Sequence, residues 1–219
     1  GMNRMVLGIL DSDSIPIEAS IVSMSISYEY DGENIPFSHV NATYHAWPGG
    51  FGGVFITQID FPHSGTWMAE ITPQDGNATG ELGRLAFKVM EKSFTPVLGH
   101  PAPATHNFTS NDVTSLNKIT TDPDPDPDLY SITIAEALKT ARPLVVTFAT
   151  PGLCASTTCG PQVDVIKELK AIYGTYVNFI HVEIYANPME VSEDINKAKV
   201  VGAVKEWGLP SEPWTFIVD

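Results

Sequence analysis

The chain has 219 residues, of which 43% are hydrophobic and 17% charged, a composition typical of a folded globular protein. Its 26 acidic residues outnumber its 12 lysines and arginines, and the formal net charge of −14 disfavours nucleic acid as a partner. No apolar run is long enough to span a bilayer, so we expect contact with a membrane only through an anchor outside this sequence.

Residues 5–90 show the pattern of short β-strands. Apolar and polar residues alternate, and Gly-, Pro- and Asp-rich turns such as residues 31–34 interrupt the alternation at short intervals. The clearest strand segments are residues 19–30, 53–61, 66–71 and 84–90. This pattern predicts an all-β immunoglobulin-like sandwich over residues 1–93, although this region has no cysteine pair of its own.

Residues 94–128 are rich in Pro, Asp, Thr and Asn and predict a linker or a strap along a surface rather than a core. Four aspartates alternate with prolines in the tract Asp122, Asp124, Asp126 and Asp128. They lack the glycine turn and the terminal glutamate of a calcium loop, so we interpret them as a solvated spacer.

Residues 129–219 alternate between helical and strand patterns. Helical spacing occurs in residues 131–141, 162–174 and 193–208, and strand patterns occur in residues 143–150, 177–185 and 213–219. The alternation predicts an α/β domain with at least one parallel crossover.

The only two cysteines, Cys154 and Cys159, lie between the predicted strand and the predicted helix near residue 162. Gly160 and Pro161 follow, and proline favours the first turn of a helix, so Cys159 is expected at the helix N-terminus. Backbone N–H groups and the helix dipole stabilise a thiolate there, and the four-residue spacing allows a disulfide. This geometry favours redox exchange.

Two other roles for the cysteine pair remain open. A structural disulfide is one, although so short a ring removes little chain entropy. A copper site is the other, with Cys154, Cys159 and His181 as ligands, because soft sulfur and imidazole suit that metal.

Two segments resemble the thioredoxin-like family over residues 129–219. "PLVVTFATPGLCASTTCGPQ" resembles the central strand and active-site turn, and "EWGLPSEPWTFIVD" resembles the proline-led return strand. The family usually has C-x-x-C, whereas this chain has "CASTTC" followed by Gln162, so the alignment of Cys159 stays ambiguous. Because the family continues past the position of Asp219, the resemblance also implies either a domain truncated at its C-terminal end or a sheet edge that is completed in another way.

The resemblance implies a cis peptide bond before Pro213, with Glu212 and Trp214 beside it in a substrate groove. It further implies an extracytoplasmic thiol–disulfide oxidoreductase, secreted or anchored at the cell surface, acting on protein thiols or disulfides. Such a protein needs no cofactor beyond its redox-active disulfide, and an upstream thiol protein donates its electrons. The alternatives are a Sco-like copper-binding protein and a non-catalytic binding protein on the same scaffold.

Overall fold

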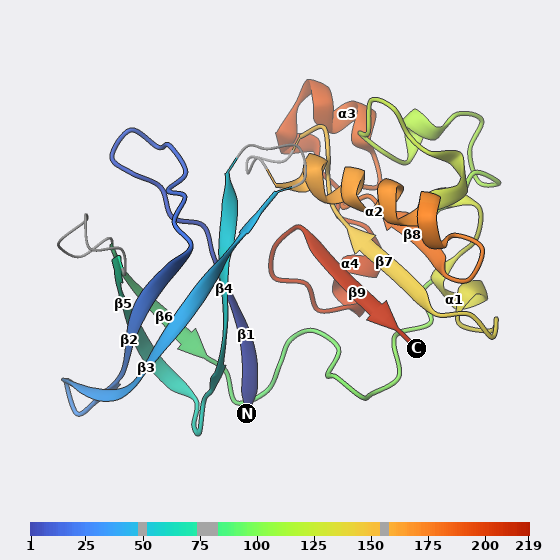
Figure 1. Ribbon diagram of the computed structural model, residues 1–219. Coiled ribbons are helices and arrows are strands. Elements are labelled where there is room, and N and C mark those ends of the chain that lie inside the picture. The colour runs from blue at the N-terminus through green and yellow to red at the C-terminus, as the bar shows by residue number, and fades with distance from the viewer. Residues whose placement is uncertain (48–51, 74–82, 154–157) are drawn as a thin grey trace. The chain divides into compact units, whose positions relative to one another are not determined.

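The computed structural model describes residues 1–47, 52–73, 83–153 and 158–219 (Figure 1). The chain forms two compact units, Gly1–Lys92 and Ser93–Asp219.

The N-terminal unit is a curled, six-stranded antiparallel sheet. Its strands, in the order β1-β4-β3-β2-β5-β6, are β1 (Met2–Leu7), β4 (Gly53–Asp60), β3 (Glu33–Ala46), β2 (Ile21–Tyr30), β5 (Gly65–Pro73) and β6 (Gly83–Val89). The four clearest strand segments of the sequence correspond to β2, β4, β5 and β6, whereas β1 and β3 were not singled out. The described strands form one continuous hydrogen-bonded sheet, so the predicted two-sheet sandwich is wrong in its layering.

The hairpin between β2 and β3 shows how local sequence sets this sheet. Tyr30 pairs with Glu33, which leaves Asp31 and Gly32 as a two-residue loop. Both have positive φ, 50° and 78°, as a type I′ turn requires, and Asp-Gly is a favoured sequence for that turn.

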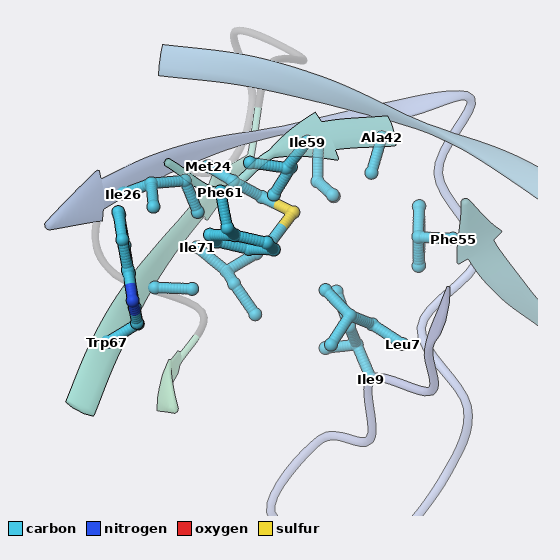
Figure 2. Close-up of a cluster of buried hydrophobic side chains, with 12 residues drawn as sticks. Leu7, Ile9, Met24, Ile26, Ala42, Phe55, Ile59, Phe61, Trp67 and Ile71 are labelled. Atoms are coloured by element: carbon cyan, nitrogen blue, oxygen red, sulfur yellow. The ribbon is translucent and has the colours of Figure 1, made fainter. Parts of the chain in front are cut away.

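Alternate residues of the strands bury one face of this sheet in a hydrophobic core (Figure 2). On β2 the buried residues are Val22, Met24 and Ile26, spaced by two as strand geometry demands. Trp67 on β5 is fully buried, and its ring contacts Phe61 edge-on at a centroid distance of 4.9 Å. The curl of the sheet therefore encloses apolar side chains without a second sheet.

The C-terminal unit contains a three-stranded mixed sheet with strand order β8-β7-β9. The strands are β7 (Leu144–Phe148), β8 (Asn178–Val182) and β9 (Trp214–Val218), with β7 parallel to β8 and antiparallel to β9. The helices are α1 (Ile134–Ala137), α2 (Cys159–Tyr173), α3 (Pro188–Glu193) and α4 (Gly202–Glu206), with short 3-10 turns η1 (Leu116–Lys118), η2 (Pro127–Tyr130) and η3 (Ile195–Lys197). The predicted α/β alternation is confirmed, with fewer helical residues than the sequence suggested.

Two of the expected helices differ from the prediction. Residues 131–141 form only the single turn of α1, which begins at a capping box between Thr133 and Glu136. Residues 193–208 are interrupted, because η3 and an isolated bridge between Tyr185 and Val200 separate α3 from α4.

Hydrophobic clusters lie on both faces of the small sheet. On one face, Val146 and Ile180 pack with Ile134 of α1 and Trp207 after α4. On the other face, Phe179 of β8 packs with Ile166 of α2 and with Leu129 and Tyr130 of η2.

Residues 94–128 belong to the C-terminal unit and act as the strap that the sequence allowed. Ile119 joins a hydrophobic cluster, and Thr120 and Asp122 are buried. The solvated-spacer interpretation is therefore wrong for Asp122, which pairs with Lys167 of α2.

Candidate functional site

Cys159 is the first residue of α2 and is disulfide-bonded. The helix begins where the sequence predicted, with Gly160 and Pro161 in its first turn, and the missing N–H of Pro161 costs no helical hydrogen bond there. Cys159 has 0% exposure and packs with Ala149 and Val163. The chain's other cysteine, Cys154, lies outside the described residues.

Pairing between β7 and β9 brings Pro213 close to the residues around Cys159. Phe148 pairs with Trp214, so Pro213 lies at the level of Ala149, the residue that packs on Cys159. The Glu212–Pro213 peptide bond is cis, the conformation that the resemblance implied. Trp214 stacks on Phe216 at an interplanar angle of 14°, which fixes its ring beside the start of β9.

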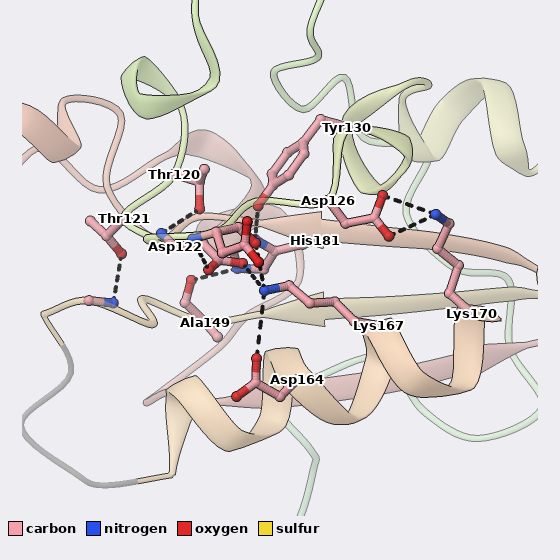
Figure 3. A network of polar contacts seen from close by, with 12 residues as sticks. Thr120, Thr121, Asp122, Asp126, Tyr130, Ala149, Asp164, Lys167, Lys170 and His181 are labelled. Carbon is pink, nitrogen blue, oxygen red and sulfur yellow. Dashed lines mark hydrogen bonds and ion pairs between the residues drawn. The ribbon is translucent and has the colours of Figure 1, made fainter.

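His181 of β8 is buried and has both ring nitrogens in hydrogen bonds (Figure 3). Nε2 lies 3.0 Å from the carbonyl oxygen of Ala149, which can only accept, so this nitrogen carries the proton. Nδ1 then accepts from the hydroxyl of Tyr130 at 2.7 Å. Burial lowers the pKa of His181 to about 4, so the ring is neutral near pH 7.

This arrangement bears directly on the copper alternative. Neither nitrogen of His181 is free to bind a metal unless its present partner is displaced. Within the described ranges, no three or more Cys, His, Asp or Glu side chains gather as a metal site would need. Of the three candidate copper ligands, the structure describes Cys159 and His181, and Cys154 lies outside the described residues.

Glu183 is a buried carboxylate two residues further along the chain, just past the end of β8, with 4% exposure. One of its oxygens accepts from the backbone N–H and the hydroxyl of Thr121, both at 2.8 Å, and the other accepts from the N–H of Ile184 at 3.0 Å. Burial raises the pKa of Glu183, and the bonds from Thr121 and Ile184 oppose that rise.

Thr121 also links the strap to the loop that leads to the cysteines. Its hydroxyl accepts from the N–H of Gly152 at 3.0 Å while donating to Glu183. A single side chain thus ties the strap, Glu183 and the loop after β7 together.

Two lysines of α2 hold the strap against the helix. Lys167 pairs with Asp122 at 2.7 Å and also donates to the carbonyl of Asp124, while Lys170 pairs with Asp126 at 2.7 Å and with Asp128 at 2.6 Å. Partial burial lowers the pKa of Lys167, but the hydrogen bonds and charges of Asp122 and Asp164 together outweigh burial and raise it. The Asp-Pro tract is therefore a set of ion-pair partners for the helix that carries Cys159.

Sequence reasoning singled out Cys159, Pro213, Glu212 and His181 as candidates, and it did not single out their neighbours Tyr130, Glu183, Thr121 and Lys167. The signal for Glu183 in the sequence was its position at the end of an apolar strand, because a glutamate is seldom buried there without a specific partner. Thr121 gave none, because its partners lie 31 and 62 residues away.

No known protein family, curated protein or solved structure matched this chain when it was compared with each. No helix of the described residues is long and apolar enough to cross a membrane.

Proposed function

We propose that the C-terminal unit is a thioredoxin-like domain that exchanges thiols and disulfides with protein partners outside the cytoplasm. The observation that carries the proposal is a disulfide-bonded cysteine at the first residue of a helix that follows a parallel strand. A cis-proline, Pro213, at the level of the residue that packs on this cysteine adds support.

The burial of Cys159 supports different roles for the two sulfurs. A partner protein cannot reach the sulfur of Cys159, which has 0% exposure. We therefore assign the attack on partners to Cys154 and the resolving role to Cys159. The N-terminus of α2 stabilises the thiolate of Cys159 when it leaves or attacks.

The proposed reaction transfers two electrons to a partner disulfide. The thiolate of Cys154 attacks one sulfur of that disulfide, which forms a mixed disulfide and releases the first partner thiolate. The thiolate of Cys159 then attacks the Cys154 sulfur, closes the intramolecular disulfide and releases the second partner thiolate. Both released thiolates take protons from solvent, and an upstream thiol protein returns two electrons to the pair.

The direct test is reduction of insulin by dithiothreitol, followed by turbidity. The wild type is expected to accelerate precipitation well above the dithiothreitol background, and Cys159→Ser and Cys154→Ser are each expected to abolish the acceleration. Asp164→Asn, an exposed substitution on α2, is the matched control and is expected to retain full activity. A wild type no faster than background would leave the domain as a non-catalytic binding scaffold.

A further inference from the structure

A cavity of about 230 Å³ lies in the C-terminal unit beside β8. Its walls come from the strap near Asn107, from the end of β8 and from the start of α4. Its lining includes Phe108, Glu183, Tyr185, Val201, Gly202 and Glu206.

One wall of the cavity is the open edge of β8, which is the last strand of its sheet. The N–H of Asn178 and the carbonyl of Val182 form hydrogen bonds on the β7 side of the strand. Because successive residues of a strand point their backbone groups to opposite edges, the backbone groups of His181 and Glu183 face the open edge. Within the described chain, no backbone hydrogen bond reaches these two residues from that edge. Along this edge the carbonyl groups of both residues can accept a hydrogen bond from a ligand, and their N–H groups can donate one.

The charge of the cavity wall is negative. Glu183 and Glu206 line it together with His106 and His181, and no lysine or arginine does. Among the described residues, no ion pair reaches either carboxylate. The pKa of Tyr185, on the same wall, is raised by burial and then by the charges of Glu212 and Glu183.

The two carboxylates differ in how they are held. Glu183 already accepts three hydrogen bonds, so it contributes chiefly its charge. Glu206 accepts from the hydroxyl of Thr105, which itself accepts from the indole N–H of Trp207 at 3.0 Å. This chain of bonds fixes one oxygen of Glu206 and leaves acceptor capacity on the carboxylate for a ligand.

The remaining walls are apolar or aromatic. Phe108, Tyr130 and Tyr185 supply rings, and Ile119, Val200 and Val201 supply aliphatic surface. Aromatic faces attract cations, and the aliphatic surface suits a short alkyl chain. The volume lies below the usual range of about 300–1,000 Å³ for drug-sized ligands, so only a small group fits.

We propose that this cavity binds a primary alkylammonium group, which donates to Glu206 and to the open-edge carbonyls of β8 and places its alkyl chain against the apolar walls. This site is independent of the proposed thiol exchange, and either can fail without the other. The ammonium has two sources, a free small amine or the lysine side chain of a partner protein.

Backbone amide chemical shifts of the full ¹⁵N-labelled chain test the proposal at constant pH. We expect n-butylammonium to shift amides along the cavity, those of Glu183, Val201 and Gly202 first, and size-matched neutral 1-butanol to leave them in place. The source is read from a second titration with Nα-acetyl-lysine methylamide. Tighter binding of this compound than of n-butylammonium assigns the site to lysine side chains, and weaker binding assigns it to free amines.

Two variants and a matched control complete the test. Glu206→Gln keeps a hydrogen-bond acceptor but removes the charge, and we expect n-butylammonium to bind about tenfold more weakly. Gly202→Leu fills the cavity from an exposed position and is expected to abolish binding, whereas Glu190→Gln, an exposed substitution on α3, is expected to leave it unchanged. Equal shifts with 1-butanol, or affinity unaffected by both Glu206→Gln and Gly202→Leu, would overturn the proposal.

Discussion

Replacing Lys167 with methionine is expected to destabilise the C-terminal unit. The change keeps a long apolar side chain on α2 but removes the charge that pairs with Asp122 at 2.7 Å. The side chain of Asp122 is 4% exposed, so its carboxylate would remain buried without a counter-ion.

The size of the effect follows from burial of the pair. Removing one partner of a buried ion pair costs about 3–5 kcal/mol, because the remaining charge stays desolvated. The side chain of Lys167 is 21% exposed, so water screens the pair in part and we expect the lower end, about 3 kcal/mol. The double variant Lys167→Met/Asp122→Asn should recover most of this loss, because asparagine removes the stranded charge and still accepts from the N–H of Asp124.

Native-state hydrogen exchange measures the loss within one unit of the two-unit chain. The buried amide of Ile180 in β8 should exchange about a hundredfold faster in Lys167→Met, because each 1.4 kcal/mol is about tenfold. The amide of Met24 in the N-terminal sheet is the internal control and should not change. An Ile180 amide that keeps its wild-type rate, or no recovery in the double variant, would refute the reasoning about the buried charge.

Two further predictions concern the same unit. Burial lowers the pKa of His181 from 6.5 to about 4, so between these pH values the unfolded chain binds a proton at this residue and the folded chain does not. The resulting contribution to stability is fully present above pH 6.5 and is lost as the pH falls toward 4. Over that range, urea titrations should show the free energy of unfolding of the wild type falling by about 3 kcal/mol relative to that of His181→Asn. Glu183 has the opposite pH dependence, but it is present in both proteins and cancels in the comparison. Parallel curves of unfolding free energy against pH would contradict the assignment. Gly208 and Gly99 both have positive φ, but a Cβ at Gly208 would also overlap the carbonyl of Phe94, whereas one at Gly99 meets nothing within 4 Å. Gly208→Ala should therefore lower the melting temperature clearly more than Gly99→Ala, and equal effects would exclude the steric term.

Local patterns in the sequence predicted the strands and helices better than their assembly. The period-two alternation of Val22, Met24 and Ile26 identified β2, and Asp31-Gly32 marked the turn that follows it. Nothing in that alternation says whether the strands divide into two sheets or curl as one, because either layering buries the same residues. The predicted sandwich failed for this reason.

The candidate site divides in a similar way. Pro161 and the strand-to-helix junction fixed the place of Cys159 at the start of α2, since both are properties of neighbouring residues. The contacts of Glu183 with Thr121 and of Lys167 with Asp122 join residues more than 40 positions apart, and only the fold brings them together. The acidic, proline-rich composition of the strap indicated solvation because the sequence does not show which lysines face it.

A redox titration of the cysteine pair tests the central claim most directly. The full chain is equilibrated in glutathione or dithiothreitol buffers of defined potential, acid-quenched and alkylated, and the labelled fraction of Cys159 is measured by mass spectrometry. The account predicts one two-electron transition within about −120 to −270 mV, the range of thiol–disulfide exchange proteins. A pair that stays fully oxidised below about −300 mV, as structural disulfides do, would contradict it.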